Sequence, residues 1–126
     1  MEKIKVTAAV IINKHKILLA RRRKDDHQGG KWELPGGKIE KGETSKQCLK
    51  RELHEELGID AKIGKLLGKN VHQYHDKTIE LIAYQVNFYK NNFTLKAHDE
   101  IYWLERNHLK TLDIAAADLP ILEKLL

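Results

Sequence analysis

The chain has 126 residues, one cysteine, a formal net charge of +5 and an aromatic content of 6%. One cysteine excludes an internal disulfide framework, and the first residues lack the long apolar run of a signal peptide or a membrane span, so we expect a cytoplasmic protein. The positive charge suits an anionic partner. Because the chain has neither a long basic run nor an aromatic-interleaved basic stripe, we do not expect a nucleic-acid polymer as that partner, and without an apolar span we expect no membrane contact.

We expect one domain, residues 1–126, because the length suits one hydrophobic core and no linker or repeat is visible. Hydrophobic patterning predicts both strands and helices within it. Alternating or densely apolar stretches predict strands at residues 5–12, 16–20, 61–68, 78–88 and 101–104. Helices are expected at 44–57 and at about 119–126, and polar turns at 13–15 and 91–92. This mixture indicates the α+β class.

The helix expected at residues 44–57 has an acidic side next to an apolar one. At 3.6 residues per turn, Glu52, Glu55 and Glu56 share one narrow arc beside a stripe of leucines. Like charges at this spacing cost a few tenths of a kcal/mol per pair. A hard divalent cation such as Mg²⁺ or Mn²⁺ would relieve that repulsion. The alternative is a solvated acidic face paired with nearby lysine and arginine side chains.

Signals at both ends define this helix and the loop before it. Thr44 and Gln47 have the spacing of a capping box, and Gly58 follows the last apolar residue as a stop signal. Gly36 and Gly37, which follow a proline, predict a turn without side-chain bulk. Such a turn can expose carbonyls or amides to a metal or a phosphate, or it can be an ordinary tight turn.

The spacing of these residues resembles the Nudix box at every defined position. Gly37 is followed by five residues, Glu43, seven residues and then RELHEELGI, which ends at Ile59. VTAAVIINKHKILLARR and ADLPILEKL, outside the box, resemble the MutT-type branch and its CTP pyrophosphohydrolase relatives. The resemblance implies a Nudix α/β/α sandwich, with a mixed β-sheet between helices and the box at residues 37–59.

The resemblance also implies a metal site and a reaction. It assigns Mg²⁺ or Mn²⁺ binding to the carbonyl of Gly36 and to the carboxylates of Glu52, Glu55 and Glu56. By the same resemblance, Arg51 and Glu43 support catalysis structurally, since Arg51 is expected to pair with Glu43 and hold the box loop. The implied reaction is hydrolysis of a nucleoside triphosphate to the monophosphate and pyrophosphate.

MutT-type enzymes usually place a further acid six positions before the tryptophan of the last core strand. Here that position is Ala97, so the general base is open. Asp99 and Glu100 are the nearest substitutes, and Glu55 is a candidate within the box. His98 is a further possible base, although a lone loop histidine is more often structural or solvated.

The same pattern implies four substrate-binding residues. Arg22 and His27 are expected near the phosphates or the sugar, and Lys77 occupies a place where arginine often occurs. Asp118 falls where MutT has a base-reading asparagine. A carboxylate there can accept hydrogen bonds from the amine of cytosine or from N1 and N2 of guanine, and it can donate only when protonated. Alternatively, Asp118 caps the helix that begins near Pro120.

Three functions are compatible with these residues. The first is nucleotide-pool sanitising by a MutT-like 8-oxo-dGTP diphosphatase, which would protect DNA replication. The second is hydrolysis of CTP, dCTP or a modified cytosine nucleotide. The third is a noncatalytic nucleotide-binding module, which the missing acid at Ala97 keeps open although the box glutamates argue against it. The sequence leaves open whether the protein is a monomer or a dimer.

Overall fold

The computed structural model describes residues 3–25, 29–88 and 93–126. In chain order, its elements are β1 (Lys3–Val10), β2 (Ile12–Asn13), β3 (Lys16–Arg22), β4 (Trp32–Glu33), β5 (Gly36–Lys38), α1 (Ser45–Leu57), β6 (Ala61–Gln73), β7 (Thr78–Phe88), β8 (His98–Leu104), the 3₁₀ helix η1 (Arg106–Thr111) and α2 (Leu119–Leu125).

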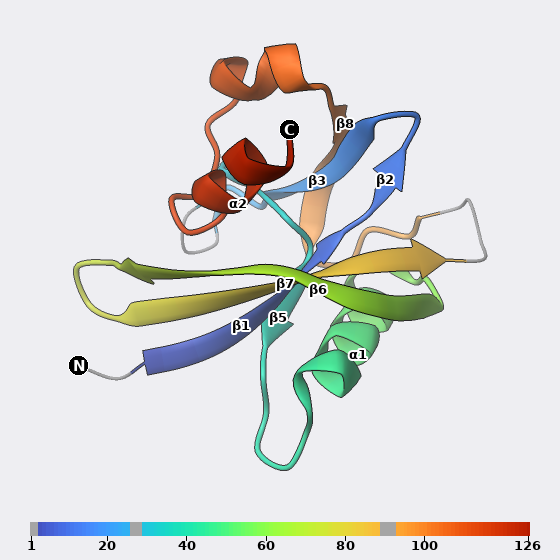
Figure 1. The fold of residues 1–126 in the computed structure, drawn as a ribbon, viewed down its shortest axis with the longest axis vertical. Helices are drawn as coiled ribbons and strands as arrows, with labels where there is room; N and C mark the ends of the chain where they lie inside the picture. The colour runs from blue at the N-terminus through green and yellow to red at the C-terminus, as the bar shows by residue number, and fades with distance from the viewer. Residues whose placement is uncertain (1–2, 26–28, 89–92) are drawn as a thin grey trace.

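The strands form two sheets. The first has the order β5-β1-β7-β6; β1 and β7 are parallel, and the other neighbours are antiparallel. The second has the order β2-β3-β4, and β8 pairs antiparallel with β3. Helix α1 lies on one side of the first sheet, and α2 and η1 lie on the other (Figure 1). The predicted α/β/α arrangement around a mixed sheet is confirmed.

Two hydrophobic cores lie on opposite faces of the first sheet because its central strands are buried on both sides. Successive side chains of a strand point to opposite faces. Accordingly, Ala8 and Val10 of β1 join the core that includes Leu122 of α2. Ala9 joins the core that includes Leu53 of α1. This double burial explains why Ala8, Ala9 and Val10, at the end of β1, form a continuous apolar run.

Helix α1 forms where the local signals predicted it. The Thr44 hydroxyl accepts a hydrogen bond from the Gln47 amide at 3.1 Å, and the Gln47 side chain accepts one from the Thr44 amide at 2.9 Å. The helix stops at Gly58, whose φ of 68° lies in the left-handed region that glycine adopts without strain. The predicted capping box and stop are therefore confirmed.

Some strand boundaries differ from the predictions. The strand expected at 5–12 is split into β1 and β2, β6 continues to Gln73, and β8 begins at His98. The turn at residues 13–15 is confirmed by positive φ angles at Lys14 and His15. Strands β4 and β5, with two and three residues, were not predicted, because so few residues show no periodicity. The turn expected at 91–92 lies outside the described residues.

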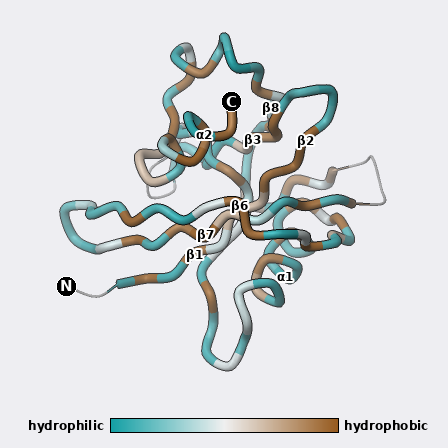
Figure 2. Tube along the Cα trace, viewed as in Figure 1, coloured by the Kyte–Doolittle hydropathy of each residue, from teal (hydrophilic) through white to brown (hydrophobic). Residues whose placement is uncertain are grey.

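Apolar and polar segments follow this layering. Figure 2 shows hydrophobic stretches where β1 and β3 run through the middle of the fold, and many hydrophilic positions at the outer end of the β6–β7 hairpin. Of the helices in the described residues, none is long and apolar enough to cross a membrane.

Candidate active site

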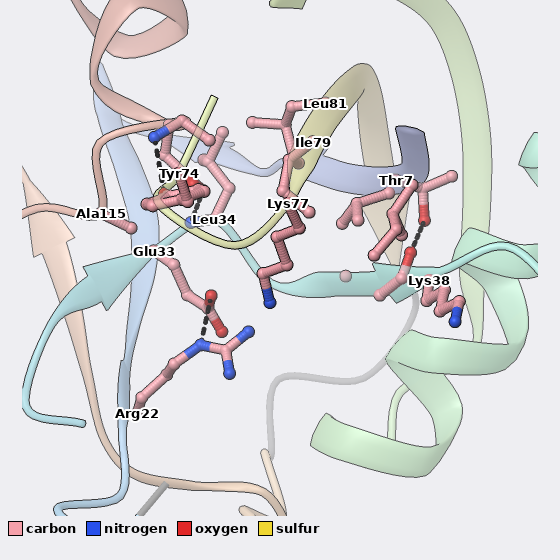
Figure 3. A pocket seen from close by; sticks show the side chains of 16 residues that line it. Thr7, Arg22, Glu33, Leu34, Lys38, Tyr74, Lys77, Ile79, Leu81 and Ala115 are labelled. Carbon is pink, nitrogen blue, oxygen red and sulfur yellow. Dashed lines mark hydrogen bonds and ion pairs between the residues drawn. The ribbon is translucent and has the colours of Figure 1, made fainter. Parts of the chain in front are cut away.

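A pocket of about 350 Å³ opens between the two sheets. Its lining comes from β1, β5 and β7 of the first sheet, from β3 and β4 of the second, and from residues 115–118 before α2. In Figure 3 the Lys77 side chain extends into the middle of the pocket, with Arg22 and Glu33 on one side and Thr7 on the other. Apolar walls with a few polar groups are typical of a small-molecule site.

Glu33 is a pocket residue that the sequence analysis missed. Its Oε1 accepts a hydrogen bond from Arg22 Nε at 2.9 Å, and its Oε2 lies 2.9 Å from His98 Nε2. Trp32 and Leu34 on either side of it are buried apolar residues. An acidic residue between two buried apolar neighbours is the signal that could have identified it.

Asp118 is buried in this pocket and does not cap α2. Its Oδ2 accepts a hydrogen bond from the Leu34 amide at 2.9 Å, and its side chain makes no capping hydrogen bond within the described part of the chain. The capping interpretation is wrong because the carboxyl group turns toward Leu34 instead of the helix amides. Burial, followed by the nearby charge of Glu33, raises the pKa of Asp118 to about 8. The carboxyl group is therefore mostly protonated at pH 7.

The box glutamates do not all gather at one point. The Glu52 and Glu56 side chains are 17% and 12% exposed, whereas Glu55 is 56% exposed and pairs with Arg51 at 3.2 Å. Burial raises the pKa of Glu56 to about 9, and hydrogen bonding with Glu52 and the charge of Glu33 add to the effect. Glu52 and Glu56 thus form the more buried pair, and Glu55 lies at the exposed edge.

The predicted pair of Arg51 and Glu43 is present. Arg51 donates two hydrogen bonds to the Glu43 carboxylate, from Nε at 2.9 Å and from Nη2 at 2.7 Å. These bonds are the main reason why the pKa of Glu43 falls to about 2. Arg51 Nη1 also donates to Glu52 at 2.9 Å. One guanidinium group therefore connects the box loop to a carboxylate on α1.

The donor chemistry of this region fits a hard divalent cation. Two partly buried carboxylates, one with a strongly raised pKa, favour a positive charge between or beside them. A Cβ atom on Gly37 would collide with the Glu52 carboxylate, so this glycine allows the box backbone to lie against that carboxylate. Across residues 3–25, 29–88 and 93–126, no three His, Cys, Asp or Glu side chains are arranged to hold a metal ion.

The structure does not bring Asp99 and Glu100 to the box glutamates. Both pair with Arg21, at 2.8 and 3.3 Å. The cause is a register shift between β3 and β8, which pairs Arg21 with Glu100 and Arg22 with His98, and leaves Asp99 as the extra residue. The structure places His98, instead of these acids, beside Glu56. It lies in a strand and is buried, so the expectation of a loop histidine is wrong.

Three of the four residues expected to bind substrate line the same pocket. These are Arg22, Lys77 and Asp118, which come from β3, the β6–β7 hairpin and the start of α2. The fourth, His27, lies outside the described residues. Tyr74 was not selected in the sequence analysis, but it lines the pocket and accepts a hydrogen bond from the Ala117 amide at 3.1 Å.

The chain is similar to curated proteins over most of its length. The family model described as NUDIX domain matches residues 2–125 of this chain. The CTP pyrophosphohydrolase of Escherichia coli K12 is 37% identical over 123 residues, which cover 98% of this chain and 91% of that protein. The 8-oxo-dGTP diphosphatase of Proteus vulgaris is 43% identical over 96 residues, which cover 75% of this chain and 86% of that protein.

Solved structures agree with this similarity. The solution structure of the E. coli ORF135 protein matches with a TM-score of 0.84 at 37% identity, and the match covers 98% of this chain and 88% of that one. The crystal structure of the MutT protein from Methanosarcina mazei Go1 matches with a TM-score of 0.88 at 27% identity, covering 98% and 92%.

Proposed function

The chain belongs to the Nudix family, and on that premise we propose that it hydrolyses a nucleoside triphosphate to the monophosphate and pyrophosphate with Mg²⁺ or Mn²⁺. The observation that carries the proposal is the partly buried carboxylate pair on α1, close to a pocket lined by Arg22 and Lys77. Cations suit the phosphates of such a substrate, and the carboxylates suit its metal. A cytoplasmic location would give the enzyme access to free nucleotides.

Each part of this site has a proposed role. Glu52, Glu56 and the Gly36 carbonyl would hold the cation, with Glu55 as a further ligand or base at the exposed edge. When bound, the cation supplies the charge that neutralises phosphate oxygens and favours deprotonated water. Arg22 and Lys77 would bind and orient the phosphates or the sugar. Arg51 and Glu43 would hold the box loop in place.

The protonation of Asp118 favours an oxidised guanine as the base. Because Oδ2 already accepts the Leu34 N–H, the proton belongs on Oδ1, and the neutral group offers a donor and an acceptor as an asparagine amide does. The 8-oxo form of guanine presents the acceptor O6 beside the donor N7–H. Unmodified guanine presents two acceptors at these atoms. We therefore propose 8-oxo-dGTP as the preferred substrate.

A cytosine nucleotide is the second candidate, favoured by the similarity to a CTP pyrophosphohydrolase over 98% of this chain. The exocyclic amine of cytosine is a donor, and an ionised carboxylate is its better acceptor. A cytosine substrate would therefore bind best to the ionised form of Asp118. The ratio of cytosine to oxidised-guanine turnover is then expected to rise with pH near 8.

The test is pyrophosphate release with Mg²⁺ from 8-oxo-dGTP, dGTP, CTP, dCTP and 5-methyl-dCTP, compared as kcat/KM at pH 7 and pH 8.5. A preference for 8-oxo-dGTP over dGTP supports the first substrate. A preference for a cytosine nucleotide at both pH values moves the assignment to the second. No release from any triphosphate, with Mg²⁺ or Mn²⁺, would overturn hydrolysis and leave a noncatalytic nucleotide-binding module.

A further inference from the structure

His98 lies buried between two carboxylates of the candidate site. Its side chain is 2% exposed. Its Nε2 lies 2.9 Å from Glu33 Oε2, and its Nδ1 lies 3.5 Å from Glu56 Oε2. In the part of the chain that the structure describes, Nδ1 has no hydrogen-bond partner. A buried nitrogen without a partner is rare and costs free energy, so this arrangement needs a reason.

The two carboxylates belong to different halves of the site. Glu33 is on β4, lines the pocket and accepts a hydrogen bond from Arg22. Glu56 is on α1 and belongs to the carboxylate pair of the box. His98 on β8 contacts both, although β8 itself has no residue among those that line the pocket. The imidazole ring is thus a link between the pocket and the box helix.

The contact of His98 Nε2 with Glu33 is a hydrogen bond, whereas that of Nδ1 with Glu56 is slightly too long for one. The Nε2 contact has ordinary hydrogen-bond length, whereas 3.5 Å at Nδ1 is longer than an ordinary N–H···O bond. The ring is rigid, so its two nitrogens keep a fixed separation. If a ligand in the pocket shifts Glu33 by a few tenths of an ångström, Nδ1 must move relative to Glu56 as well.

We propose that His98 is a positioning residue that couples occupancy of the nucleotide pocket to cation binding at Glu56, through its hydrogen bond with Glu33 and its 3.5 Å approach to Glu56. This inference rests on the proposed function. A base in the pocket fixes Glu33, and the ring then closes the Nδ1 contact and holds Glu56 for the cation. Coupling between two sites is reciprocal, so a cation at Glu56 also strengthens binding in the pocket by the same factor.

The experiment measures binding alone, with no turnover. Mn²⁺ affinity is measured by electron paramagnetic resonance of free Mn²⁺, with and without saturating 8-oxo-2′-deoxyguanosine or cytidine. These nucleosides carry no phosphate, so they cannot link the two sites by binding the cation through phosphate oxygens. We expect the nucleoside to strengthen Mn²⁺ binding of the unaltered protein by at least about fivefold.

Three substitutions separate the two contacts. His98→Leu removes both nitrogens, His98→Gln keeps a nitrogen near the Nε2 position and His98→Asn keeps one near the Nδ1 position. Since coupling needs both contacts, we expect the ratio of the two Mn²⁺ affinities to fall to about one in all three. His108→Leu is the matched control, because the His108 side chain hydrogen-bonds with Tyr102 outside the pocket. Its ratio should equal that of the unaltered protein.

The ratio distinguishes coupling from a merely structural role. A structural role would lower stability and weaken both affinities, but it would leave their ratio unchanged in the Gln and Asn variants. A ratio of one in the unaltered protein, or an undiminished ratio in folded His98→Gln, overturns the inference. Neither result touches the proposed function, which fails only if no triphosphate yields pyrophosphate.

Discussion

Asp118→Asn should stabilise the protein, and by an amount that grows with pH. The substitution keeps an oxygen that can accept the Leu34 amide hydrogen bond and removes the ionisable group. Asp118 has an ordinary pKa of 3.8 and a pKa of about 8 in the folded protein. Between these values the unfolded chain releases a proton that the folded chain keeps. The stability of the unaltered protein therefore falls as pH rises from 3.8 to 8.

The magnitude follows from the width of this range. Each pH unit within it lowers the free energy of unfolding by about 1.4 kcal/mol, so the total at pH 7 is about 4 kcal/mol. Asp118→Asn has no proton to lose, and its gain over the unaltered protein should approach this amount. Between pH 5 and pH 7 the gain should increase by about 3 kcal/mol.

Urea unfolding of both proteins at pH 5 and pH 7 measures the gain. Asp113→Asn is the control, because the Asp113 side chain is 71% exposed and its substitution should change stability by less than about 0.5 kcal/mol. A gain from Asp118→Asn that is the same at pH 5 and pH 7 would refute the reasoning. It would mean that Asp118 is ionised in the folded protein, and it would remove the support for an oxidised guanine.

The remaining predictions concern the box and the pocket wall. Glu52→Gln and Glu56→Gln should each lower turnover with Mg²⁺ by more than about 100-fold while the protein stays folded by circular dichroism; near-normal turnover in both contradicts the metal assignment. Glu43→Gln should lower the free energy of unfolding at pH 6 and change it little at pH 2. The low pKa of Glu43 means that its stabilisation is complete above about pH 4.5 and is lost as pH falls toward 2. An equal loss in urea unfolding at pH 6 and at pH 2 contradicts this reasoning. Tyr74→Phe removes the hydroxyl that accepts a hydrogen bond from the Ala117 amide, next to Asp118. It should therefore change the ratio of kcat/KM between 8-oxo-dGTP and CTP more than it changes the rate with the better substrate. An equal loss of kcat/KM for both substrates would argue for a purely structural hydroxyl.

Local sequence determined the box helix and its ends. The capping box, the glycine stop and the leucine stripe act within a few residues of one another, so their effect on the backbone is readable without the rest of the fold. The resemblance to the Nudix box implied the Arg51–Glu43 pair, which the structure contains. The apolar runs of β1 and β7 likewise predicted buried strands, because both faces of a central strand need apolar side chains.

Tertiary structure decided which acids work together and in which protonation state. Glu33 and His98 are 65 positions apart and meet only because β4 and β8 both pair with β3. A register shift, invisible in the sequence, turns Asp99 away and places His98 beside Glu56. The sequence allowed Asp118 either to bind the base or to cap a helix, and desolvation in the assembled pocket keeps its carboxyl group protonated. Burial and through-space charge depend on distances between distant segments, so only the folded chain fixes them.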